Sequence, residues 1–443
     1  MDTVIIRNAT IVNEGQQQSG DVLIRNGRIE KIGGVIETPE RAREINAEGL
    51  HLLPGVIDDQ VHFRDPGLKH KATIETESQA AVAGGVTSFM EMPNTKPAAL
   101  THKLLEEKYR MAYFTSAANY SFYMGVSNQN VDEVLRTNEK KKDVCGVKIF
   151  MGSSTGNMLV DNPMTLYKIF SESELLIATH CEDERIIAKN KEKFSGADNV
   201  SYHPQIRDVD ACYESSVTAV QLANKHKTRL HILHISTAKE LQLFTNFFPV
   251  EQKNITAEVC VHHLHFTADD YAKYGTQIQC NPAIKAPSNR DALWEALLDD
   301  RLDVIATDHA PHTWEEKQQP YPQSPSGIPL VQHSLLLMLE YVKQGKITLE
   351  KVVEKMCHAP AKCFLVQERG YIREGYHADL VLVDLKGDTK VSKENLLYKC
   401  GWSPFEGHDF PAQVRYTLVN GKVVYEDGVI NKAIRGQRLS FAR

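Results

Sequence analysis

Short apolar runs recur through the middle of the chain, and amphipathic helical patterns lie between most of them. Parallel strands need long crossovers that are usually helices, so this alternation predicts an α/β domain with a parallel sheet. Eight runs over about 250 residues favour a (β/α)8 TIM barrel. An open doubly wound sheet is the competitor, but no GxGxxG motif follows the first run. The apolar runs cover 56–63, 86–92, 118–126, 145–151, 175–181, 229–236, 255–261 and 303–310, and the helical patterns include 75–83, 166–174, 215–225 and 291–298.

Both ends of the chain carry a different pattern, made of short strands joined by tight turns. Asn26-Gly27 and Asn420-Gly421 are hairpin signals, because Asn-Gly favours the turn that joins two antiparallel strands. Neither end has enough strands to bury a sheet face alone. We therefore expect one small composite β-sandwich domain formed from both termini. The predicted organisation is an N-terminal sandwich segment at 1–53, the barrel at 54–364 and a C-terminal sandwich segment at 365–443.

Composition places the chain among globular proteins, with 42% hydrophobic and 24% charged residues. A net charge of -6 and a pI near 6.3 argue against nucleic-acid binding, which needs a basic face. No run approaches the roughly 18 apolar residues of a membrane span, and the N-terminus lacks a signal-peptide pattern. The eight cysteines include no CxxC pair and are typical of reduced thiols. We expect a soluble cytoplasmic protein with no nucleic-acid or membrane partner.

Polar side chains close the apolar runs of the predicted barrel. His62 and Arg64 end the first run, and their spacing of two residues places them on one face of a strand. The active sites of such barrels lie at the C-terminal ends of several strands at once. These side chains are therefore expected to share one site. The later runs end at Asn94, Lys148, His180, His234, Glu258 with His262, and Asp308.

The residue types at these strand ends predict a metal centre. Imidazoles and a carboxylate are the usual ligands of a catalytic divalent metal, which keeps one position for water. Lys148 lies between Val147 and Ile149, where burial of an unpaired ammonium is unfavourable. Burial lowers the pKa of a lysine, and the neutral amine can react with CO₂ to form a carbamate that bridges two metals. The alternative is a lysine that extends to the barrel mouth.

Two further features surround the predicted centre. The loops 153–158 and 312–329 are rich in Ser, Gly, Pro and Gln, and we expect them to act as lids. Glu258 and His262 are expected to orient a metal ligand rather than bind the ion. His263 and His265 are interpreted as structural residues.

Eight motifs follow one another in a fixed order: PGVIDDQVHFRDPG, MEMPNT, VKIF, THCED, LHIST, EVCVHHLHFT, CNPAIK and TDHAPH. This series closely resembles the amidohydrolase superfamily, and within it the class I dihydroorotases. The resemblance covers the barrel from about 54 to 364, and the flanking β segments fit the composite sandwich of that superfamily.

The resemblance implies a zinc enzyme of pyrimidine biosynthesis that reversibly hydrolyses (S)-dihydroorotate to N-carbamoyl-L-aspartate. It implies that Asp308 binds metal and moves the proton, that carboxylated Lys148 (N6-carboxylysine) bridges two metals, and that the chain forms a homodimer. His62 would bind the more buried metal, and His180 and His234 the second. The implied substrate contacts are Arg64, Asn94 and His312 at the carboxylate, with Asn281, Ser326 and Gly327 closing over the ring.

One position departs from the family pattern. That pattern opens with His-x-His, and this chain has Gln60 where the first histidine belongs. An amide oxygen is a weaker ligand than imidazole for a borderline ion such as zinc. The sequence therefore leaves the number of metals, one or two, undetermined.

The substrate is chosen by residues rather than by the fold, since relatives hydrolyse hydantoins, allantoin and dihydropyrimidines. Arg64 favours a substrate with a carboxylate beside the ring, because a guanidinium binds that group through two parallel hydrogen bonds. A structural pairing of Arg64 with Asp65 or a loop carbonyl is the alternative interpretation. Two alternative functions are an allantoinase or hydantoinase and a catalytically silent partner protein, the latter suggested by Gln60.

Overall fold

Parallel strands from the middle of the chain close into the predicted barrel. The computed structural model describes residues 3–152 and 158–443. Among those residues, neighbouring strands pair in parallel from β6 to β8 and from β9 to β14, and Val61 bridges His309 to close the ring. The strands are β6 (Val56–Val61), β7 (Val86–Glu91), β8 (Asn119–Phe122) continued by β9 (Met124–Gly125), β10 (Val147–Phe150), β11 (Ile177–His180), β12 (Leu230–Ile232), β13 (Ile255–Cys260) and β14 (Val304–Ala306).

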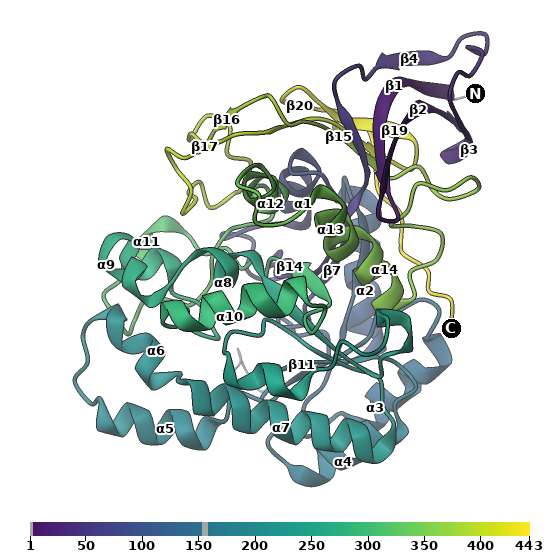
Figure 1. Ribbon diagram of the computed structural model, residues 1–443. Helices are drawn as coiled ribbons and strands as arrows, with labels where there is room; N and C mark the ends of the chain where they lie inside the picture. Colours follow the sequence, from purple (N-terminus) through teal and green to yellow (C-terminus); the bar gives the residue numbers. More distant parts are fainter. Residues whose placement is uncertain (1–2, 153–157) are drawn as a thin grey trace.

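Helices surround this barrel (Figure 1). Side-chain caps define where several of them begin: the Thr73 hydroxyl accepts from Thr76 N, and the Asp208 carboxylate accepts from Ala211 N. The described helices are α1 (Ile74–Ala83), α2 (His102–Thr115), α3 (Val131–Leu135), α4 (Pro163–Glu172), α5 (Glu184–Lys193), α6 (His203–Ile206), α7 (Val209–His226), α8 (Val261–His265), α9 (Tyr271–Tyr274), α10 (Pro287–Leu298), α11 (Trp314–Lys317), α12 (Ser334–Lys343), α13 (Leu349–Val353) and α14 (Ala359–Phe364). They cover the four predicted segments, except for Ser173 and Glu174, which follow the end of α4.

Strands from both termini form one sheet, and the predicted composite sandwich is confirmed. Figure 1 shows the purple N-terminal strands beside yellow C-terminal ones, and β5 pairs antiparallel with β15 where the two halves meet. Both Asn-Gly pairs have positive φ at each residue, as a tight hairpin turn requires. The sheet contains β1 (Thr3–Asn13), β2 (Gln16–Arg25), β3 (Arg28–Gly33), β4 (Arg43–Asn46), β5 (His51–Pro54), β15 (Leu380–Asp384), β18 (Gln413–Val419), β19 (Lys422–Glu426) and β20 (Val429–Ile430), and β16 (Thr389–Lys390) pairs separately with β17 (Asp409–Phe410).

The barrel strands end earlier than the apolar runs do. β6 ends at Val61, so His62 and Arg64 both lie beyond it, and Arg64 has a φ of 65°. The expectation that they share one strand face is therefore wrong. The reason is local: Leu68 N donates to the Arg64 carbonyl, in a turn that begins three residues after the strand ends. β13 likewise ends at Cys260, which places His262 in α8 rather than on the strand.

Three further sequence expectations concern loops, membranes and thiols. The predicted lid at 153–158 lies outside the described residues apart from Met158, whereas the lid at 312–329 is described and contains α11. No helix in residues 3–152 and 158–443 is both long enough and apolar enough to cross a membrane. All eight cysteines are unpaired thiols.

Candidate metal centre and substrate cavity

A cavity of about 330 Å³ opens at the C-terminal ends of the barrel strands. It brings together every predicted site residue except Lys148, which is buried and is 1% exposed. Phe150, Ala310 and Pro325 also line it and were not predicted. The predicted residues on its wall are His62, Arg64, Asn94, His180, His234, Asn281, Asp308, His312, Ser326 and Gly327, and Gln60 joins them.

His62 and Asp308 face each other across the deep end of the cavity. His62 Nδ1 lies 2.8 Å from Asn94 Oδ1, which fixes the proton on Nδ1 because an amide oxygen only accepts. The lone pair on Nε2 then points at Asp308 Oδ1, 3.1 Å away. Two acceptors at that distance need a cation or proton between them. Gln60 Nε2 donates to the same Asp308 oxygen at 3.0 Å.

His180 and His234 form a second pair of nitrogen donors. His180 Nδ1 lies 3.0 Å from His234 Nε2. Zn–N bonds of about 2.0–2.1 Å in a tetrahedral site place two ligand nitrogens about 3.3 Å apart, so this spacing suits one shared ion. His180 Nε2 donates to Glu182 Oε2 at 2.9 Å, which leaves Nδ1 free to bind metal. Burial holds the pKa of His234 well below its usual value, so its imidazole is neutral.

Glu182 orients His180 and was not predicted. Burial alone would raise the pKa of this carboxyl group, but Arg207, which is in direct contact with it, and His180 lower that pKa to about 2. Glu182 is therefore ionised and accepts the His180 proton. Its position two residues after His180 in THCED was the available sequence signal, but the partner Arg207 is distant in sequence.

Lys148 is a buried amine with no hydrogen-bond partner among the described residues. Its Nζ lies 4.5 Å from the centre of the Phe150 ring. Burial lowers the pKa of Lys148 to about 7, although Asp308 and Glu258 act in the opposite direction. A substantial fraction of the amine is then neutral at physiological pH. This is the state that reacts with CO₂.

These donors fit a divalent metal. Two imidazole nitrogens lie 3.0 Å apart, and an imidazole lone pair and a carboxylate oxygen lie 3.1 Å apart. The ring nitrogens that do not face these positions donate to Asn94 and Glu182, the usual support for metal-binding histidines. The buried, unpartnered Lys148 amine completes a set suited to a carbamate bridge.

Arg64 and His312 form the opposite wall. Arg64 is 7% exposed, and its Nε donates to the Pro311 carbonyl at 3.0 Å. Lys71 Nζ donates to His312 Nδ1 at 2.9 Å, so Nε2 carries the proton and donates to the Ser326 carbonyl at 3.0 Å. Arg64 forms no ion pair with an acidic side chain within the described ranges. Burial lowers the pKa of Arg64 to about 10, so it remains charged at neutral pH.

Comparison with known proteins identifies the family. Residues 51–424 match the amidohydrolase family. The chain belongs to this family. It is 30% identical to a dihydroorotase of Methanosphaera stadtmanae and 30% identical to an allantoinase of Deinococcus radiodurans, in each case over 98% of both chains. The solved L-hydantoinase (dihydropyrimidinase) from Arthrobacter aurescens is 28% identical, with a TM-score of 0.92 over 97% of both chains. The predicted superfamily, and the similarity to dihydroorotases within it, are confirmed.

Hydrogen bonds to buried groups hold the described lid of this amidohydrolase, residues 312–329, in place. Lys317 is fully buried, and its Nζ donates to the carbonyls of Gln279 and Pro325 at 3.2 and 2.9 Å. Gly327 N donates to Gln279 O at 2.8 Å, and a Cβ at Gly327 would lie 2.3 Å from the Ala310 carbonyl. Glycine is thus required where the lid passes the Ala310 carbonyl. Sequence reasoning named Gly327 but missed Lys317.

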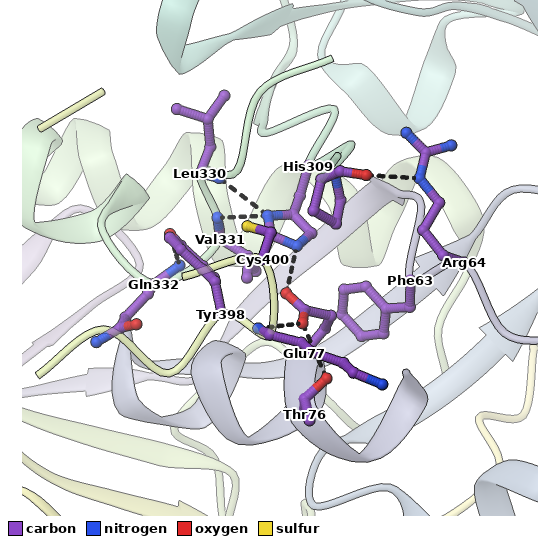
Figure 2. Close-up of polar contacts among 12 residues, drawn as sticks. Phe63, Arg64, Thr76, Glu77, His309, Leu330, Val331, Gln332, Tyr398 and Cys400 are labelled. Carbon is purple, nitrogen blue, oxygen red and sulfur yellow. Dashed lines mark hydrogen bonds and ion pairs between the residues drawn. The ribbon is translucent and has the colours of Figure 1, made fainter. Parts of the chain in front are cut away.

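A buried network outside the cavity holds the end of β14 in place. His309 Nε2 donates to Glu77 Oε2 at 2.8 Å, and its Nδ1 accepts from Leu330 N at 2.9 Å and Val331 N at 3.2 Å (Figure 2). In Figure 2 the Arg64 guanidinium points away from Glu77. His309 follows Asp308 directly, so this amidohydrolase fixes the backbone of its predicted catalytic aspartate through a neighbouring side chain.

Proposed function

We propose that this amidohydrolase is a dihydroorotase, which interconverts (S)-dihydroorotate and N-carbamoyl-L-aspartate. The observation that carries the proposal is Arg64. A buried guanidinium without an acidic partner is unfavourable, and Arg64 lines the cavity in that state. A substrate carboxylate supplies the missing anion. The Pro311 carbonyl takes only the Nε proton, and the 3.1 Å contact of Nη2 with His312 Nε2 supplies no negative charge. The loop-carbonyl alternative therefore leaves the charge of Arg64 uncompensated.

The neighbours of Arg64 suit the same group. Asn94 uses its oxygen to hold His62, which leaves its amide N–H groups for a ligand in the cavity. His312 donates to Ser326 and so ties the carboxylate-binding wall to the lid. Asn281 and Gly327 complete the rim of the cavity. These contacts support a substrate with a carboxylate beside a small ring.

We further propose zinc as the metal, with carboxylated Lys148 among the groups that would hold it. His180 and His234 would supply one position, and His62 and Asp308 would supply the other. Gln60 weakens the second position, because its amide N–H group donates to the Asp308 oxygen that would face the ion. A bound metal supplies a Lewis acid that polarises the ring carbonyl and lowers the pKa of water.

The chain's own residues bind the substrate and move the proton. Arg64 fixes the carboxylate and thereby sets which ring carbonyl lies deepest in the cavity. Gln60 Nε2 donates to Asp308 Oδ1, and no described residue donates to Oδ2. Asp308 takes a proton from the attacking water and delivers it to the departing ring nitrogen. The lid above Gly327 limits the access of bulk water.

Two alternative functions remain in competition. The relative from Deinococcus radiodurans is an allantoinase at the same identity as the dihydroorotase, so the overall similarity does not choose between them. A catalytically silent partner protein rests on Gln60 alone. A homodimer and a cytoplasmic location remain predictions from the sequence.

The test compares substrates on one preparation. Purified protein, loaded with zinc, is assayed with dihydroorotate, allantoin and hydantoin under identical conditions. We expect turnover of dihydroorotate to exceed that of the other two by at least 100-fold, about 2.7 kcal/mol in transition-state binding. Preference for allantoin or hydantoin would overturn the proposal, and inactivity on all three with full metal loading would favour the silent partner.

The metal count is tested separately. Elemental analysis gives metal per chain, and intact mass under non-denaturing conditions detects one added CO₂ on Lys148. Gln60→His restores an imidazole, and we expect it to increase occupancy of the His62 position. Unchanged metal content in Gln60→His would show that Gln60 does not limit binding there.

A further inference from the structure

We propose that Cys260, His262 and His263 form an additional metal site, separate from the catalytic centre, for a thiophilic divalent ion such as zinc. Cys260 ends β13, and the two histidines belong to α8, which begins at the next residue. One ligand atom from each residue lies within 4.8 Å of the others. This proposal goes beyond the dihydroorotase assignment and does not depend on it.

Three of the four ring nitrogens of the two histidines are buried without a hydrogen-bond partner among the described residues. His262 is 1% exposed and His263 is 3% exposed. Neither ring nitrogen of His262 has a hydrogen-bond partner among the described residues, and the Thr307 backbone is the neighbour within reach of one ring N–H. Leaving polar atoms buried and unsatisfied is unfavourable. A bound ion supplies a partner to the ring nitrogen that coordinates it.

His263 already has the hydrogen bond expected of a metal ligand. Its Nε2 lies 3.1 Å from the Pro282 carbonyl, which only accepts, so Nε2 carries the proton. The lone pair is then on Nδ1, which is buried and has no partner in residues 3–152 and 158–443. A backbone carbonyl on the far ring nitrogen is the usual support for a metal-binding histidine.

Cys260 supplies the soft ligand. Its sulfur lies 3.5 Å from Glu258 Oε1 and 3.9 Å from Gln60 Oε1. Oxygen atoms of a type that binds metals therefore lie beside the sulfur. Binding converts the thiol to a thiolate: the S–H bond breaks, an S–metal bond forms and one proton leaves to solvent. Ligand atoms on a tetrahedral zinc lie about 3.3–3.8 Å apart. Closing the group around an ion therefore needs a contraction of about 1 Å, small for side-chain rotation.

The site is structural rather than catalytic. None of its three residues lines the substrate cavity. An ion there would connect the last residue of β13 to the first turn of α8. Glu258 links the two metal regions, because its Oε1 also accepts from His234 N at 2.9 Å.

Cobalt substitution tests the proposal on the whole chain. Protein produced with Co²⁺ in place of zinc should show a sulfur-to-cobalt charge-transfer band in the near ultraviolet, because none of the proposed catalytic ligands is a thiolate. Cys260→Ser should remove the band and one equivalent of metal. Cys181→Ser is the matched control, since Cys181 is also buried, follows the proposed ligand His180 and donates to Thr179 Oγ1 instead. It should keep the band.

The wild-type spectrum decides the matter even if Cys260→Ser fails to fold. Cobalt protein without a thiolate band would overturn the proposal, as would a band that survives in Cys260→Ser. His262→Gln and His263→Gln should each weaken the band. Dihydroorotate turnover is recorded in parallel, so loss of activity and loss of this site are separate outcomes.

Discussion

Replacement of Arg64 by glutamine is the sharpest test of how substrate is recognised. Arg64 has five N–H donors, of which Nε is used by the Pro311 carbonyl, while an Nη2 nitrogen lies 3.1 Å from His312 Nε2. The remaining donors suffice for two parallel hydrogen bonds to a carboxylate. Each hydrogen bond to a charged group contributes about 1.5–3 kcal/mol. Glutamine can keep one weaker contact, so the net loss is about 3–4 kcal/mol.

That loss corresponds to a fall in kcat/KM of about 10²–10³-fold for dihydroorotate. The assay follows ring opening by absorbance at equal metal content in both proteins. Dihydrouracil, the same ring without the carboxylate, is the control substrate and should react equally with both. Arg64→Lys keeps the charge but not the planar fork, and we expect about a tenfold loss.

Two results would refute this reasoning. The first is an Arg64→Gln enzyme within threefold of wild type on dihydroorotate, which would mean that Arg64 serves the loop carbonyl only. The second is an equal loss on both substrates, which would mean that Arg64 shapes the cavity rather than binding the carboxylate. A matched melting temperature excludes misfolding as the cause.

Substitutions at three other positions separate proton transfer, lid closure and stability. Asp308→Asn should lower kcat by about 10²–10⁴-fold; normal turnover in a metal-loaded variant would contradict the proton role. Gly327→Ala places a Cβ 2.3 Å from the Ala310 carbonyl and should lower kcat/KM at least tenfold, whereas Gly345→Ala, also at positive φ but with open space around it, should not. Glu77→Gln weakens the bond to His309 and should reduce the free energy of unfolding by about 1–3 kcal/mol in urea titrations; an unchanged midpoint would contradict it.

Much of the fold could be predicted because its signals are local. The barrel strands are buried on both faces, so they stand out as continuous apolar runs such as VKIF in β10. The Asn-Gly pairs specify hairpins through their own φ preferences. The ends of the barrel strands were predicted less exactly than their positions along the chain. The apolar run 56–63 continues past Val61 in sequence, but the strand β6 ends at Val61, shortly before a turn.

The sequence by itself determined which residue types meet at the barrel mouth, because the C-terminal ends of parallel strands converge whatever the details of packing. Only the tertiary structure decided what each of them does there. Asn94 orients His62, and Arg207 keeps Glu182 ionised. Gln60 donates to Asp308 where the first and last strands of the barrel meet. These partners come from different elements, so their pairing depends on backbone positions set by the whole fold. For the same reason the sequence did not reveal the Cys260 group. Only the fold buries the His262 ring and the Nδ1 atom of His263 without partners among the described residues.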